Sequence, residues 1–195
     1  MKTKITLLAS TLFALVAGSA SAGPDFVGKS HGAKDLAASD ARTAILPADD
    51  VAFDHNSYAL RDTTMTQIAT VARWMKANPS RKIVLEGHAD ASGDARYNDD
   101  LAAKRADLVR SHLIGHGVKA DRILVVVYGE SQAKRDVSPI DRRVVLWATH
   151  EPLDVVARRV LVDNRANHAM WTRNGVQFTE TRGTPRVTDG AVASR

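Results

Sequence analysis

Residues 51–149 alternate between short β-branched runs and longer segments with helical apolar spacing. In residues 62–78, apolar side chains recur every three or four positions, with Asp62 as a candidate N-cap and Pro79 just past the end, which predicts an amphipathic helix. Residues 98–114 predict a second helix, which ends at a glycine. The remaining apolar runs predict four strands, at residues 51–53, 82–86, 123–128 and 142–149.

These elements follow the order β-α-β-α-β-β. Such an order is typical of an α/β fold, and we expect a two-layer sandwich in which the helices pack on one mixed sheet, followed by a C-terminal extension. The globular domain is predicted over residues 48–150. Residues 23–47, polar and rich in small residues, predict a linker before it.

The C-terminal extension, residues 151–195, has a different pattern. Asn174-Gly175 stands between two short apolar runs, which indicates a hairpin with a type I′ turn, and the tail beyond it has the composition of a disordered segment. Two interpretations remain open for the apolar residues of this hairpin. They either dock another envelope protein or cover an open edge of the domain, and we favour the cover. The apolar residues concerned are Met170, Trp171 and Phe178.

The first 22 residues fit a secretory signal peptide. Lys2 and Lys4 precede an apolar stretch over residues 5–17, and Ala20-Ser21-Ala22 offers small residues for cleavage. A retained membrane anchor is the alternative, but an apolar core this short spans a bilayer poorly. No other run is long and apolar enough, so no transmembrane span is expected in the mature chain. The sequence has no cysteine, so neither a lipid-attachment cysteine nor a disulfide is expected.

Charge and motif content exclude several classes of function. The formal net charge is +5, the basic residues are dispersed and aromatic residues make up 5% of the chain, so no nucleic-acid surface is predicted. The pair His112 and His116 has zinc-type spacing without the glutamate of an HExxH motif, so a metal site stays a less favoured alternative. No nucleophile motif, phosphate-binding loop or cysteine nucleophile is present, so we expect neither an enzyme nor a cofactor.

The candidate chemistry lies in residues 83–109, where one acid and one base flank a loop. Asp90 follows a predicted strand and Arg105 comes fifteen residues later on a predicted helix. A carboxylate recognises an ammonium group and a guanidinium fork recognises a carboxylate, so the pair could hold a zwitterion. Asn98, Leu101 and Arg105 share one helix face, with Arg105 about 10 Å along the axis from Asn98. A plain Asp90–Arg105 salt bridge is the alternative interpretation, and Asn98 could instead be the helix N-cap.

A set of linked motifs over about residues 48–150 resembles the C-terminal domain of outer-membrane protein A, a family that includes the peptidoglycan-associated lipoprotein and the periplasmic part of flagellar stators. The motifs are Gly87-His88-Ala89-Asp90, Gly93, Asn98, Leu101, Lys104-Arg105-Ala106, Val109, Gly117-Val118, Gly129-Glu130 and Asp141-Arg142-Arg143-Val144. The resemblance implies a non-catalytic periplasmic protein, associated with the cell wall and with the outer membrane as one possible location. Its partner would be peptidoglycan, bound non-covalently through the diaminopimelate of the stem peptide.

The same resemblance implies a set of binding residues. Asp90 matches the aspartate that pairs with the ligand's ammonium group, and Arg105 matches the arginine that holds its carboxylate. We expect alanine at either position to abolish peptidoglycan binding with little loss of thermal stability. The other expected site residues are Asn98, Leu101 and, of the paired arginines, Arg143 rather than Arg142. Ala89 and Asp141 stand where the family usually has threonine and asparagine, and both changes could weaken binding.

Overall fold

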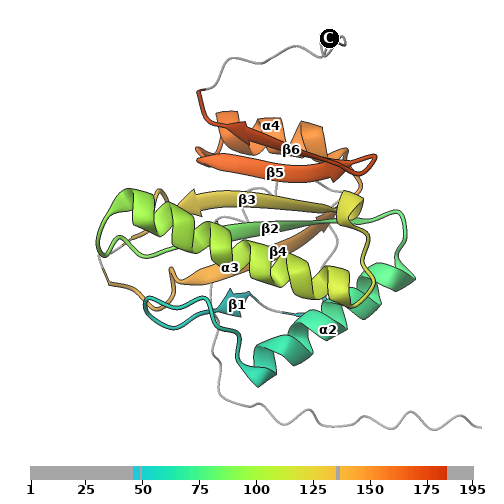
Figure 1. Cartoon of the computed structure of the whole chain (residues 1–195), viewed down its shortest axis with the longest axis horizontal. Coiled ribbons are helices and arrows are strands. Elements are labelled where there is room, and N and C mark those ends of the chain that lie inside the picture. Colours follow the sequence, from blue (N-terminus) through green and yellow to red (C-terminus); the bar gives the residue numbers. More distant parts are fainter. Residues whose placement is uncertain (1–45, 49, 135–136, 184–195) are drawn as a thin grey trace, which may run out of the picture.

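The computed structural model describes residues 46–48, 50–134 and 137–183. Their centre is a six-stranded mixed sheet with the strand order β1-β4-β2-β3-β5-β6 (Figure 1). Strands β2 and β3 run parallel, and the other neighbouring strands run antiparallel. The strands span Val51–Ala52 (β1), Lys82–His88 (β2), Ile123–Gly129 (β3), Arg143–Thr149 (β4), His168–Arg173 (β5) and Val176–Thr181 (β6).

The helices are α2 (Asp62–Ala77), α3 (Ala95–Gly115) and α4 (Leu153–Val162), with a short 3₁₀ turn, η1 (Ala120–Arg122), before β3. The predicted N-cap Asp62 is wrong, and so is the alternative interpretation of Asn98 as an N-cap. Asp62 is the first helical residue of α2, because Arg61 takes the cap position. Helix α3 begins before Asn98, since the Asp94 carboxylate accepts hydrogen bonds from the first free N–H groups of the helix. Among the described helices, none has the length and apolar character that a membrane span requires.

The sheet is covered on both faces. Ile83 and Leu85 of β2 face α2 and α3, whereas Val84 between them faces α4. The predicted order β-α-β-α-β-β is confirmed for residues 51–149, and so is the mixed sheet with packed helices. The difference from the expectation is a third layer. Because the central strands are apolar on both sides, the second side also needs a cover, and α4 provides it.

Most of the C-terminal extension belongs to this core. Strand β5 pairs with β3 and extends the sheet, and β6 pairs with β5 through a turn in which Asn174 and Gly175 have φ of 52° and 78°. Trp171 packs with the apolar side of α4 in a second hydrophobic cluster. The structure therefore supports the edge-covering interpretation of the hairpin. The expected signal peptide, most of the linker and the end of the tail lie outside the described residues.

A close contact between β2 and α3 sets the position of the candidate site. A Cβ atom on Gly87 would collide with the backbone carbonyl of Ala102, so glycine lets the helix lie directly against the strand. Ala102 and Ala106, both fully buried, form the helix side of this contact. This contact also brings the backbone carbonyl of the next residue, His88, within hydrogen-bonding distance of the Arg105 side chain, one of the predicted site residues.

Candidate functional site

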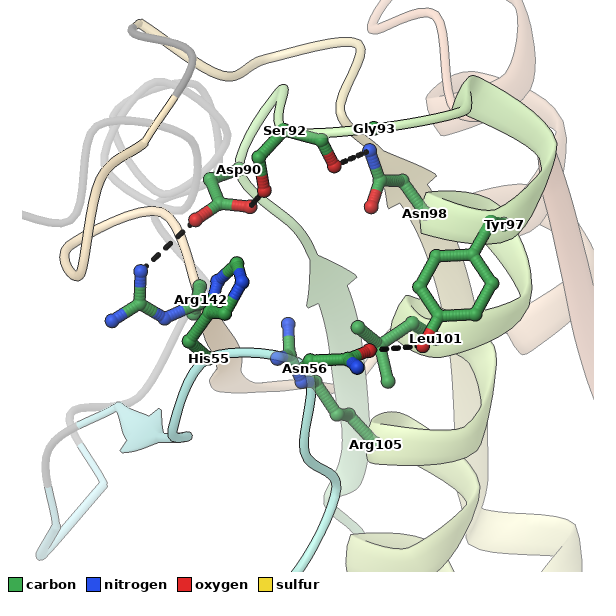
Figure 2. Close-up of a pocket in the computed structure, with 10 residues that line it drawn as sticks. All are labelled: His55, Asn56, Asp90, Ser92, Gly93, Tyr97, Asn98, Leu101, Arg105 and Arg142. Carbon is green, nitrogen blue, oxygen red and sulfur yellow. Dashed lines mark hydrogen bonds and ion pairs between the residues drawn. The ribbon is translucent and has the colours of Figure 1, made fainter.

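A pocket of about 430 Å³ opens where β2 ends, between the β1–α2 loop and the first half of α3. Four of the five predicted site residues line it: Asp90, Asn98, Leu101 and Arg105. Figure 2 shows their side chains converging from the loop after β2 and from α3, with His55 and Asn56 facing them from the β1–α2 loop. Residues far apart in the sequence thus form one cavity.

Asp90 provides the anionic end of the pocket. Its carboxylate accepts hydrogen bonds from the Ser92 hydroxyl at 2.6 Å, from Arg142 Nη1 at 2.9 Å and from the Ser138 backbone N–H at 3.4 Å. Burial alone would raise the pKa of Asp90, but these three donors outweigh it and hold the pKa below the ordinary value. Asp90 is therefore a carboxylate at neutral pH.

Arg105 provides a cationic end, and it is fully buried. Its guanidinium donates to three backbone carbonyls, those of Ser57 at 2.9 Å, His88 at 3.2 Å and Asp54 at 3.1 Å. It also lies over the Phe53 ring, 5.3 Å from the centroid. Burial lowers the pKa of Arg105 to about 10, an effect that Asp90 opposes, so the side chain keeps its charge at neutral pH.

Asp90 and Arg105 do not form a direct ion pair in the part of the chain that the structure describes. Each instead has its own partners, and both line the pocket from different elements. The plain salt-bridge interpretation is therefore wrong. The expectation that Arg105→Ala would leave stability unchanged is not supported either, because this guanidinium ties the β1–α2 loop and the end of β2 to α3.

Asn98 and Leu101 complete the α3 side of the pocket. The Asn98 amide donates to the Ser92 carbonyl at 3.1 Å and to a Glu130 carboxylate oxygen at 2.6 Å, so it joins the loop after β2 to the end of β3. Leu101 is buried one turn further along and adds an apolar wall. The shared helix face that the spacing predicted is thus present.

Comparison with known proteins agrees with this arrangement. Residues 52–145 match the model of the OmpA family. The chain carries an OmpA family domain. Over 84 residues it is 36% identical to the peptidoglycan-associated lipoprotein of Mesorhizobium japonicum, and over 97 residues it is 34% identical to outer membrane porin F of Pseudomonas aeruginosa.

The similar regions are only parts of these proteins. The match covers 43% of this chain and 50% of the lipoprotein, and 49% of this chain and 28% of the porin. Among solved structures, the peptidoglycan-associated lipoprotein from Burkholderia pseudomallei aligns with a TM-score of 0.50 and 28% identity, over 52% of this chain and 91% of that one. The fold of the OmpA domain is therefore shared, and the extension after it lies beyond the matched region.

Arg142, not Arg143, faces the pocket of the OmpA domain. Strand β4 begins at Arg143, whose side chain follows the alternation of the strand to the α4 face of the sheet, where Asp50 is its partner at 3.3 Å. Arg142 precedes the strand and pairs with Asp90. The expectation for Arg143 is thus corrected, and the reason is the alternation along the strand: Val144 faces α2 and α3, so the neighbouring Arg143 faces α4.

The two departures from the usual OmpA pattern have different surroundings. Asp141 accepts from the Lys134 backbone N–H at 3.1 Å, and its other oxygen lies 3.6 Å from Nη1 of Arg143. Asp141 therefore neutralises the arginine that points away from the pocket, and Arg142 keeps Asp90 as its carboxylate partner. Ala89 is buried beside the site, and its backbone N–H donates to the Gly129 carbonyl.

The sequence interpretation missed the rim of the pocket. Tyr97 and Asn56 form a hydrogen bond across the pocket mouth, joining α3 to the β1–α2 loop (Figure 2). Asn56 has a φ of 51°, a conformation that asparagine adopts more readily than most residues. The Asn56-Ser57 turn signal was recognisable, but nothing in the local sequence indicates that the turn folds over α3.

A separate pair of ionisable groups is buried on the α4 face, behind the site. His88 Nε2 lies 3.9 Å from a Glu86 carboxylate oxygen, and the His88 ring stacks on Tyr128 with centroids 5.0 Å apart. The other Glu86 oxygen accepts from Trp147 Nε1 at 2.9 Å. Burial lowers the pKa of His88 below its ordinary value of 6.5, although Glu86 opposes this, so the imidazole is neutral at neutral pH.

Because its pKa is lowered in the folded chain, His88 is expected to make the protein less stable at acidic pH. The unfolded chain binds a proton at this histidine near its ordinary pKa, whereas the folded chain binds it only at lower pH, so stability is expected to decrease as the pH falls below that ordinary value. The thermal midpoint should drop between about pH 7.5 and about pH 5.5, as followed by circular dichroism. In His88→Phe, which keeps the stacking on Tyr128, the drop should be smaller. Burial lowers the pKa of His168 as well, so the variant His168→Gln measures how much of the drop comes from this second histidine. An unchanged pH profile in His88→Phe would contradict this assignment.

Proposed function

We propose that this chain is a non-catalytic cell-envelope protein that binds peptidoglycan non-covalently, and that its OmpA domain does so through the diaminopimelate of the stem peptide. The domain would work in the periplasm, at the cell wall. The family match and the resemblance to peptidoglycan-associated lipoproteins support the peptidoglycan part of the proposal. The diaminopimelate part is carried by the hydrogen-bonding capacity that the pocket leaves unused.

Arg105 has the donors that a ligand carboxylate needs. A guanidinium has five N–H groups, and among the described residues Arg105 directs one from Nε and one from each terminal nitrogen to backbone carbonyls. One N–H therefore remains on each terminal nitrogen. These two N–H groups equal in number the two oxygens of a carboxylate, a group that arginine frequently binds through two hydrogen bonds.

Asp90 has the matching capacity for an ammonium group. A carboxylate offers about four lone-pair sites, and the three donors identified above fill three of them. The remaining site can accept one N–H from a ligand. The free end of diaminopimelate carries an ammonium and a carboxylate on one carbon, so it fits a pocket with an anion and a cation on different walls.

The experiment is co-sedimentation of the purified protein with sacculi whose stem peptides contain diaminopimelate, followed by competition. We expect the protein to sediment with the sacculi, and free meso-diaminopimelate to release it. Nα-acetyl-lysine amide, which carries the side-chain ammonium group and no carboxylate, is the matched competitor and should release far less. Equal release by this compound and diaminopimelate would contradict the diaminopimelate part, and absence of sedimentation would contradict peptidoglycan binding. Soluble muropeptides in the supernatant would instead indicate a hydrolase.

A further inference from the structure

We infer, on the basis of the proposed function, that Arg142 forms a second carboxylate site, so that the pocket prefers stem peptides that end at diaminopimelate over those that continue to D-alanine. The geometry points to this because the described pocket lining carries an unequal set of charges. Asp90 is the anion, and Arg105 and Arg142 are two cations.

Ligand binding disturbs the balance between these charges. Without a ligand, Arg142 and Asp90 neutralise each other at 2.9 Å. When a ligand ammonium group approaches Asp90, it also approaches the guanidinium that already binds there, and the two cations repel each other. A second carboxylate on the ligand, placed at Arg142, would remove this repulsion. A ligand with one ammonium and two carboxylate groups therefore matches the three charges one by one.

Arg142 has the donors to bind that carboxylate. Its Nη1 donates to Asp90, and its Nε makes only a long contact of 3.5 Å with the Phe53 carbonyl. In the described part of the chain its Nη2 has no hydrogen-bond acceptor, and the side chain is 12% exposed. Figure 2 shows Arg142 reaching the pocket from a different element than Arg105, so the two guanidinium groups can bind different ends of one ligand.

The chemistry of the stem peptide supplies such a ligand. In a stem that ends at diaminopimelate, the main-chain carboxylate of this residue is free, and the side chain carries its own ammonium and carboxylate groups. The diaminopimelate residue then presents one cation and two anions. When D-alanine follows, the main-chain carboxylate becomes an amide and loses its charge. The next carboxylate lies one residue further from the side chain.

The test compares three synthetic ligands by calorimetry with the whole chain: the tripeptide L-Ala-γ-D-Glu-meso-diaminopimelate, the same tripeptide with its main-chain carboxylate amidated, and the tetrapeptide with D-alanine. Because a hydrogen-bonded charge pair is lost, we expect the Kd of the amide and of the tetrapeptide to be about tenfold higher than that of the free tripeptide. The amide differs from the tripeptide in one charge, so it isolates the contribution of that carboxylate.

Variants assign the preference to one arginine. In Arg142→Gln the three ligands should bind with similar Kd, whereas Arg143→Gln, whose guanidinium pairs with Asp50 and Asp141, should keep the wild-type preference. Equal affinity of the wild-type chain for tripeptide and amide, with diaminopimelate competition intact, would overturn the inference and leave the proposed function standing. Absence of binding to all three ligands would overturn both. A preference that persists in Arg142→Gln would also overturn the assignment.

Discussion

Replacing Val160 by aspartate should unfold the whole domain, whereas the same replacement at Val162, two residues later on the same helix, should change the thermal midpoint by only a few degrees. Val160 is 0% exposed and lies in the cluster between α4 and the sheet, while Val162 is 77% exposed. Loss of a buried valine costs about 2 kcal/mol, and a buried ionised carboxylate without a partner costs several kcal/mol more. Domains of this size are stable by only about 5–15 kcal/mol.

The measurement is thermal unfolding by circular dichroism, with Val162→Asp as the matched control for the introduced charge. Loss of the cooperative transition in Val160→Asp alone would mean that α4 is part of the folding unit. If Val160→Asp unfolds with a wild-type midpoint, then α4 is not needed by the sheet, and the extension would be free to dock a partner. The outcome therefore tests whether α4, the first element of the C-terminal extension, is part of the core of the domain.

The elements of the OmpA domain could be predicted because their apolar spacing is strong and uninterrupted. The run Ile123–Tyr128 and the helical spacing over residues 62–78 each allow one kind of element, and both are present within a few residues of the expected ends. The central strands β2, β3 and β4 carry apolar residues on both faces, and this pattern implies that both faces of the sheet are covered. The pattern does not indicate which element covers the second face. Helix α4 was not predicted because Arg158 and Arg159 interrupt its apolar run, although both lie on the side of the helix away from the core.

The site residues that belong to a recognisable motif could be predicted from the sequence. The residues whose role depends on the direction of the side chain could not. Asp90 and Arg105 belong to the motifs and line one pocket. Arg142 and Arg143 are adjacent and chemically identical, so only the direction in which the side chains of β4 alternate determines which of them faces the pocket, and the apolar residues on both faces of β4 leave that direction open in the sequence. A shift of one residue in a strand moves every side chain to the other face, and sequence patterns locate strand ends less accurately than this.

The surroundings of Arg105 were also beyond sequence reasoning. Its three acceptors are backbone carbonyls of Asp54, Ser57 and His88, and the carbonyl of any residue type looks the same in a sequence. The motif indicated a ligand-binding arginine on the surface of a pocket. The structure adds that the same side chain holds the β1–α2 loop against the end of β2, and thereby helps to build the pocket that it lines.

This double role leads to the second large effect. Arg105→Ala should both abolish binding of the stem peptide and lower the free energy of unfolding by about 3–5 kcal/mol, because one buried and two partly buried carbonyls lose their donor and the Phe53 ring loses its cation. Urea unfolding measures the second effect. Arg110→Ala is the control on the same helix, since the Arg110 side chain makes only a peripheral pair with Asp107 at 3.5 Å and its loss should cost little.

Loss of binding in Arg105→Ala could follow from a collapsed pocket alone, so Asp90→Asn has to accompany it. This variant keeps the shape of the side chain and the packing around it, but removes the charge that would hold the ammonium group. We expect it to stay folded and to bind diaminopimelate at least about tenfold more weakly. Wild-type affinity in Asp90→Asn would show that Asp90 only anchors Arg142. Binding weakened in both variants, with stability lowered only in Arg105→Ala, would separate the recognition of the ligand from the construction of the pocket.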